Sequence, residues 1–159
     1  MSARINYYHQ APQLLNQISK LSLSLNESSL DTSLRDLVNI RASTLNGCAF
    51  CLDMHVKEAR IHGERDLRVH HTHVWRESPL FTAREKAALE WTEAVTRLSR
   101  EGIPDDLYQR TREYFSEKEL TELTVAIGVI NLWNRLAISF QAPPGSADKT
   151  FGLDKAGLS

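Results

Sequence analysis

Apolar residues recur at intervals of three and four along most of the chain, and the alternating β-branched runs that predict strands are nearly absent. Gly and Pro are sparse and stand between the periodic segments. The pattern therefore predicts an all-α protein of about six to seven helices, with no internal repeat. The expected helices cover residues 12–25, 33–45, 48–62, 64–76, 82–98, 104–115 and 117–141.

Several of these helices have clear start and stop signals. Thr82 and Glu85 have the spacing of a capping box, in which each side chain binds the other residue's backbone N–H, and Ser116 and Glu119 repeat it. The Asn46–Gly47 pair is a turn signal that separates the second helix from the third. These signals place the boundaries of the helices that carry the most interesting side chains.

The length and composition indicate one globular domain. The chain has 159 residues, of which 42% are hydrophobic and 25% charged, with a net charge of −1. The predicted helical domain covers residues 1–145, and the small, polar residues 146–159 are expected to form a mobile C-terminal tail. The charge favours neither a nucleic-acid partner nor a membrane surface. No signal peptide is recognised, so we expect a cytoplasmic protein, in which a permanent disulfide is uncommon.

The last helix is apolar on nearly every side between residues 123 and 138. A helix of this kind has to be covered all round, and a subunit interface is an economical cover in a short chain. We therefore predict a homo-oligomer. Asn131, Asn134 and Arg135 interrupt the apolar surface, and buried polar groups need partners. We expect them to bond across helices or subunits rather than to line an active-site pocket.

The segment NGCAFCLDMH contains both cysteines of the chain. On a helix, the spacings of Cys48, Cys51 and His55 place all three side chains on one face. Cys48 lies at the expected helix start, where the helix dipole favours a thiolate. Three interpretations remain open from the residues alone. They are a redox-active pair, a metal site completed by a carboxylate, and burial of small apolar side chains.

An acidic residue in the preceding helix extends this constellation. Asp36 lies about ten residues before the turn at Asn46, and His55 lies about nine residues after it. In an antiparallel helix pair the two positions come level, each about 14 Å from the turn. Asp36 would then reach the cysteines through His55 or a water molecule. Carboxylate, imidazole and two thiols together form a possible proton relay.

These residues resemble a known family. The segments LVNIRASTLNGCAFCLDMHVKEA, WRESPLFTAREKAALEWTEAVT and NLWNRLAISF are similar to the AhpD-like alkylhydroperoxidases of the carboxymuconolactone decarboxylase superfamily. The similarity covers roughly residues 10–142. It implies an all-helical fold assembled as trimers or hexamers. It also implies a thiol peroxidase that reduces organic hydroperoxides without haem, flavin or metal, and that is reduced by an external dithiol of lipoyl or thioredoxin-like type.

The resemblance also implies a role for each site residue. Cys51 would be the peroxidatic cysteine, Cys48 the resolving cysteine, and His55 a member of the proton relay with Asp36 as its acid. The family usually carries Glu at the position of Asp36, and Asp reaches about 1.5 Å less. The shorter side chain requires a bridging water or gives a weaker relay.

Two other functions are alternatives to the peroxidase. A redox-sensing or thiol–disulfide exchange module would use the same cysteine pair without reducing peroxides. An enzyme of the carboxymuconolactone decarboxylase type would share the fold without relying on a redox-active pair, and the presence of both cysteines favours the peroxidase over it.

Overall fold

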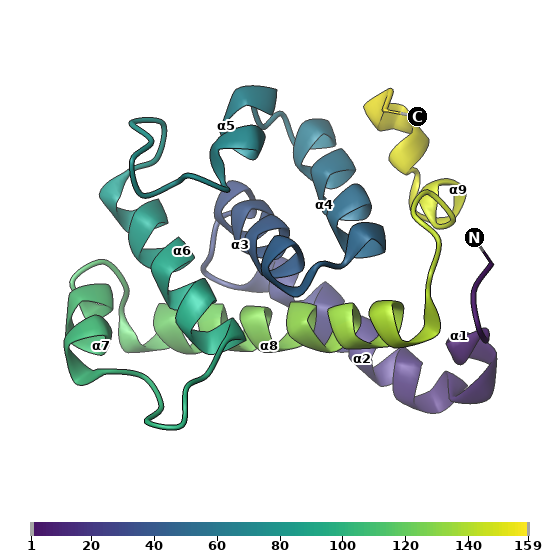
Figure 1. Cartoon of the computed structure of the whole chain (residues 1–159), viewed down its shortest axis with the longest axis horizontal. Helices are drawn as coiled ribbons and strands as arrows, with labels where there is room; N and C mark the ends of the chain where they lie inside the picture. Colours follow the sequence, from purple (N-terminus) through teal and green to yellow (C-terminus); the bar gives the residue numbers. More distant parts are fainter. Residues whose placement is uncertain (1, 159) are drawn as a thin grey trace.

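The computed structural model describes residues 2–158, so Met1 and Ser159, the outer ends of the predicted domain and tail, lie outside the description. Within residues 2–158 the chain forms nine α-helices, two short 3₁₀-helices and no β-strand (Figure 1). The α-helices are α1 (Tyr7–Gln10), α2 (Pro12–Ser24), α3 (Thr32–Asn46), α4 (Ala49–Ile61), α5 (Asp66–His71), α6 (Ala83–Thr96), α7 (Asp105–Arg112), α8 (Glu117–Phe140) and α9 (Asp148–Phe151). The 3₁₀-helices are η1 (Leu25–Glu27) and η2 (Leu153–Ala156).

The predicted all-α class is confirmed, and six of the seven predicted helices agree with α2, α3, α4, α6, α7 and α8 to within a few residues. Both capping boxes are present, at Thr82 and at Ser116. The helix predicted for residues 64–76 is shorter, because α5 ends at His71 and the Thr72 hydroxyl donates to the Val69 carbonyl. The estimate of six to seven helices was too low, since the four-residue helices α1 and α9 carry too few residues for a periodic pattern.

Helix α8 is the longest element, and α3, α4 and α6 pack on one side of it (Figure 1). Its buried residues supply much of the core, including Leu123 and Ile127, which pack with Phe115 and Leu34. A second, smaller core cluster lies towards the other end of α8 and contains both cysteines. Helices α3 and α4 form an antiparallel pair across the turn at Gly47, which adopts the left-handed conformation with φ of 70°. The site described below lies on this helix pair.

Part of the apolar surface of α8 remains open. Val125, Leu132 and Ile138 are each at least 40% exposed, whereas residues such as Leu123, Ile127 and Asn134 are buried. Helix α8 is long and apolar enough to span a membrane, a property that core helices of globular proteins share. The buried Asn131 and Asn134 on its inner side identify it as a core helix of this fold.

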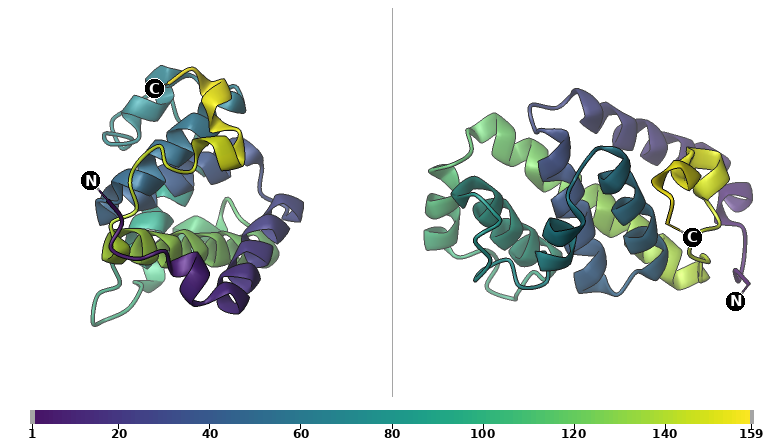
Figure 2. Two further views of the ribbon diagram at one scale, coloured as in Figure 1. Left: turned by 90° about the vertical axis from the view of Figure 1, so that its right-hand side faces the viewer. Right: turned by 90° about the horizontal axis from the view of Figure 1, so that it is seen from above.

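The C-terminal segment, expected to be a mobile tail, is folded against α4 (Figure 2). Leu153 and Ala156 of η2 are buried. Lys57 of α4 is buried as well, and its ammonium group lies 2.7 Å from the carboxylate of Asp148 and 2.9 Å from that of Asp53. The small, polar composition of this segment concealed the two buried apolar residues and the ion pair between Asp148 and Lys57 that attach it.

Candidate active site

The two cysteines lie at the start of α4. Cys48 is the N-cap residue, and the backbone N–H of Cys51 donates to its sulfur over 3.3 Å, as the predicted helix start requires. The Sγ atoms lie 2.7 Å apart, and both cysteines are free. Their exposed fractions are 2% and 3%, so the pair is buried beneath neighbouring side chains. Only about 0.7 Å of approach separates the sulfurs from the length of a disulfide bond.

The two thiols have different acidities. The hydrogen bond with Cys51 is the main cause that lowers the pKa of Cys48 to about 7, and it outweighs the opposing effect of burial. The same hydrogen bond, together with burial, raises the pKa of Cys51. The pair therefore loses one proton readily and holds the second one strongly. The negative charge that the pair gains on ionisation near pH 7 lies on Cys48, where the helix start and the hydrogen bonds stabilise it.

A buried amide network supports the cysteine pair from α8. Asn134, which is fully buried, acts on both thiols and lowers the pKa of each. It also donates to Ser43 of α3 and accepts from the amide of Asn46 at 2.8 Å. Asn46 donates to Asn131 as well. The expectation that these side chains bond across helices is confirmed for Asn131 and Asn134, whereas Arg135 donates to Asn131 of its own helix. Asn134 also influences the thiols, so it belongs to the surroundings of the candidate site as well as to the core.

Two histidine–carboxylate pairs follow the cysteines along α4. His55 Nδ1 lies 2.6 Å from Glu58 Oε2, on the next turn of the same helix. His62 Nδ1, at the C-cap of α4, lies 2.7 Å from Asp36 Oδ2 of α3. Burial raises the pKa of Asp36, and the hydrogen bond with His62 opposes this shift. The pKa of Glu58 is lowered, because hydrogen bonding and charge interaction with His55 outweigh the large opposing effect of burial.

The structure brings most of the predicted site together. Cys48 and Cys51 are in contact, and His55 is near enough for its charge to lower the pKa of Cys48. Asp36 lies on the facing helix, as predicted, and the charge of His55 acts on it, but its hydrogen-bond partner is His62. Among residues 2–158, no group of three or more His, Cys, Asp or Glu side chains has the arrangement that a metal ion needs.

Three residues beside the site were missed from the sequence. Glu58 and His62 continue the spacing of three and four from Cys51 and His55, so extending the helical face beyond His55 would have found them. Tyr7 of α1 is the third. Burial, Tyr8 and the two cysteines together raise its pKa to about 12. Its sequence distance from the cysteines left no pattern by which it could have been recognised.

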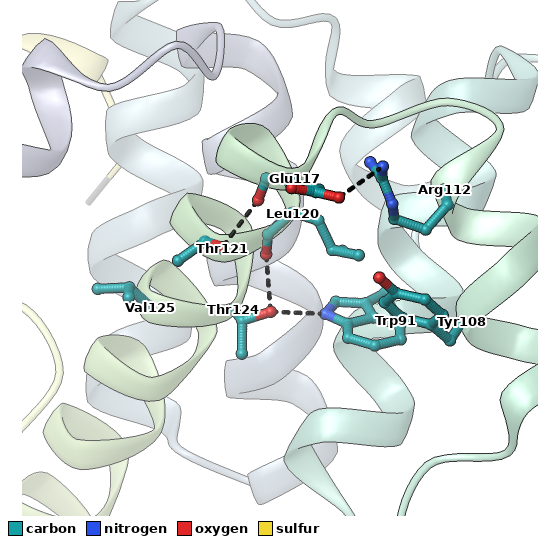
Figure 3. Close-up of a pocket in the computed structure, with 8 residues that line it drawn as sticks. All are labelled: Trp91, Tyr108, Arg112, Glu117, Leu120, Thr121, Thr124 and Val125. Atoms are coloured by element: carbon teal, nitrogen blue, oxygen red, sulfur yellow. Dashed lines mark hydrogen bonds and ion pairs between the residues drawn. The ribbon is translucent and has the colours of Figure 1, made fainter.

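A cavity of about 460 Å³ lies elsewhere, where α6, α7 and α8 meet (Figure 3). Trp91 of α6 donates to Thr124 of α8 at its wall, and Arg112 lies 3.6 Å from Glu117 at its rim. None of the residues that line this cavity belongs to the cysteine cluster. The cavity therefore lies apart from the cysteine pair and is not part of the candidate active site.

Comparison with known proteins identifies the family. The profile of the carboxymuconolactone decarboxylase family matches residues 10–94, more than half of the chain. The chain therefore belongs to the carboxymuconolactone decarboxylase family, and its fold is the AhpD-like single domain of that family. The family match agrees with the resemblance seen in the sequence around the cysteine pair.

Individual relatives cover nearly the whole chain. The uncharacterized protein YdfG of Bacillus subtilis is 40% identical over 139 residues, which are 87% of this chain and 95% of YdfG. A crystal structure from Agrobacterium tumefaciens, of a protein of unknown function with a proposed role as the antioxidant defence protein AhpD, is 42% identical with a TM-score of 0.86. It covers 90% of this chain and 98% of its own.

A more distant structure shares the fold alone. It is the alkylhydroperoxidase AhpD core of an uncharacterized peroxidase-related protein from Ralstonia eutropha, 19% identical with a TM-score of 0.77. The match covers 88% of this chain and 75% of that chain.

Proposed function

We propose that this protein is a thiol-dependent peroxidase that reduces organic hydroperoxides through a Cys48–Cys51 dithiol and disulfide cycle. The observation that carries the proposal is the buried pair of free cysteines, 2.7 Å apart, in which the pKa of Cys48 is lowered to about 7. A thiolate beside a second thiol is the arrangement that peroxide reduction and disulfide closure need. The AhpD role proposed for the Agrobacterium tumefaciens protein supports the same class of activity.

The reaction uses both sulfurs in turn. A thiolate attacks the terminal oxygen of the hydroperoxide, so the O–O bond breaks and the alkoxide leaves as an alcohol after it takes a proton. The oxidised sulfur is then a sulfenic acid. The second thiol displaces water from it, and the disulfide forms. An external dithiol reduces this disulfide by exchange and is itself oxidised to a disulfide.

The resemblance assigns the attack to Cys51 and the resolution to Cys48, and we keep this assignment. Cys48 has the lower pKa and ionises first, so the proton of Cys51 has to move to the Cys48 thiolate before the attack. The two sulfurs are hydrogen bonded, so this transfer needs no other group. His55 lies one turn from Cys51 and is the histidine nearest to it in the sequence, so we assign it the proton that the leaving alkoxide takes up. Asp36 occupies the position of the acidic member of the relay in the family.

The proposed partners follow from this chemistry and from the exposed apolar residues of α8. We place the reaction in the cytoplasm, where a lipoyl-type or thioredoxin-like dithiol is available as the reductant. We also propose a homo-oligomer, a trimer or hexamer, in which a second copy covers Val125, Leu132 and Ile138. A monodisperse monomer in sedimentation would contradict the oligomer without affecting the proposed reaction.

The activity is tested by following the loss of an organic hydroperoxide with a panel of dithiol reductants. We expect turnover by the wild type and its loss in Cys51→Ser. Cys48→Ser should lose turnover but still consume about one equivalent of peroxide, because Cys51 can be oxidised once without a resolving partner. Full activity of Cys51→Ser would overturn the assignment of roles. A wild type that exchanges disulfides but leaves every peroxide intact would favour a thiol–disulfide exchange module.

A further inference from the structure

Helix α4 carries its reactive side chains on a single face. Cys48, Cys51, His55, Glu58 and His62 follow one another at alternating intervals of three and four residues. The face begins at the buried cysteines and ends at His62, whose side chain is 43% exposed. The distance along the helix between the two ends is about 21 Å. Asp36 faces this row from α3 through its hydrogen bond with His62.

His55 and Asp36 each have a different partner from the one that their sequence positions suggest. His55 is bound by Glu58 of its own helix, and Asp36 is bound by the outer histidine, His62. The His55 and Glu58 side chains are 13% and 28% exposed, so their 2.6 Å contact is shielded from water far more than a surface ion pair is. The pair is therefore a stable feature of the interior side of α4.

The partner of one histidine nitrogen decides what the other nitrogen can do. A carboxylate at Nδ1 holds the proton on that nitrogen and leaves Nε2 with its lone pair free. The carboxylate also stabilises the ring when Nε2 takes up a proton. Glu58 is suited to this task because its pKa is lowered by His55, so it stays ionised. Asp36 is less suited, because burial raises its pKa and its carboxylate is engaged by His62.

We propose that Glu58, rather than Asp36, is the positioning residue that orients His55 for proton transfer with the cysteine pair. This inference rests on the proposed peroxidase function. His55 takes the proton at Nε2 when a thiol of the pair ionises, and Glu58 accepts the hydrogen bond from Nδ1–H. The same proton returns from Nε2 to the alkoxide that leaves the peroxide. Asp36 and His62 form a separate outer pair that fixes the end of α4 against α3.

Other charged groups surround this pair and have to be considered in any test. The groups whose charges act on Glu58 are His55 and His62 of α4 and Arg35 of α3. Glu58 and His55 both act on Asp36 from across the helix pair. A variant at one carboxylate therefore has to be compared with the equivalent variant at the other.

The test compares Glu58→Gln with Asp36→Asn, which remove one negative charge each with little change of shape. We expect Glu58→Gln to slow peroxide consumption by roughly tenfold or more, because a neutral amide stabilises the protonated ring poorly. Asp36→Asn should slow it by less than about threefold. Asp66→Asn, at an exposed carboxylate 3.4 Å from Arg60, is the matched control and should leave the rate unchanged.

Two further measurements separate positioning from general destabilisation. Nitrogen-15 NMR should show the Nδ1–H form of His55 in the wild type and in Asp36→Asn, and a mixture of tautomers in Glu58→Gln. The pH midpoint of Cys alkylation should move upwards in Glu58→Gln, because His55 then stabilises the thiolate less well. Thermal unfolding of all three variants checks that each remains folded.

The outcomes distinguish the two proposals. An unchanged tautomer and rate in Glu58→Gln, or an effect of Asp36→Asn equal to or larger than that of Glu58→Gln, would overturn the role of Glu58. A wild type that consumes no peroxide would overturn the proposed function instead, while the NMR and alkylation measurements would still test Glu58.

Discussion

Helix α4 holds buried ionisable groups on two faces, and the two faces differ in how their protons are held. The thiol face is made of Cys48, Cys51, His55, Glu58 and His62, and the pKa of Cys48 on this face is lowered to about 7. On the other side, Lys57 is bound by two carboxylates at 2.7 and 2.9 Å, an arrangement that we call the lysine clamp. Both faces are polar and largely buried, yet only one of them can exchange protons at physiological pH.

The difference shows how structural and chemical polar groups can be told apart. In the lysine clamp, hydrogen bonds to Asp148 and Asp53 raise the pKa of Lys57, so its charge is fixed over the whole physiological range. On the thiol face the pKa of Cys48 is moved towards neutrality instead. The pKa of Lys57 moves away from 7, which fixes its charge for a structural role, whereas the pKa of Cys48 moves towards 7, which suits it to proton exchange.

The largest effect on both stability and reactivity is expected from Asn134→Ala. This change removes a fully buried amide that bonds Ser43 and Asn46 and lowers the pKa of both thiols. We expect a loss of about 2–3 kcal/mol in the free energy of unfolding, because buried polar partners are left unsatisfied. Alkylation of wild-type Cys48 should have its midpoint near pH 7, and the midpoint should rise in the variant, since Asn134 lowers the pKa of the thiol.

Denaturant unfolding and pH-dependent alkylation measure these two effects. The exposed Asn16 of α2 provides a matched control, and Asn16→Ala should change neither quantity appreciably. An unchanged alkylation midpoint in a folded Asn134→Ala protein would show that the amide network is purely structural.

A smaller effect, on stability alone, is expected from Lys57→Met. The variant leaves the carboxylates of Asp53 and Asp148 without their cation, and it removes the ion pair that attaches the start of α9 to α4. We expect a loss of about 2 kcal/mol in the free energy of unfolding, less than for a fully buried pair because both carboxylates are partly exposed. The alkylation midpoint of Cys48 should stay near pH 7.

Lys118→Met is the matched control for this variant, because the side chain of Lys118 is 74% exposed and its ion pair with Glu122 is long, at 3.7 Å. Its effect on stability should lie within about 0.5 kcal/mol. If Lys57→Met moved the thiol midpoint as far as Asn134→Ala does, the two faces of α4 would not be independent.

The helices were predictable because their signals are local. Capping boxes at Thr82 and Ser116 and the turn at Gly47 set boundaries that tertiary contacts did not alter. The folded C-terminal segment was not predictable, because it depends on Lys57 and on contacts far away in sequence. Short helices such as α9 contain too few residues to show the hydrophobic periodicity that predicts a helix.

The sequence predicted which residues lie near the cysteines, but it did not predict which histidine binds which carboxylate. The spacing of Cys48, Cys51 and His55 fixed their common face, and the helix pair brought Asp36 to the opposite side. Hydrogen-bond partners depend on side-chain direction as well as on register. Two carboxylates and two histidines lie in the same region, so sequence spacing could not decide that Asp36 binds His62 and Glu58 binds His55.

The central claim is that the cysteine pair reduces a hydroperoxide and closes to a disulfide. The most direct measurement is the number of free thiols after the reduced protein meets one equivalent of an organic hydroperoxide at neutral pH. The chain has two cysteines, and we predict the loss of both, with a Cys48–Cys51 disulfide identified by mass spectrometry. Two thiols that remain titratable after this treatment would contradict the account.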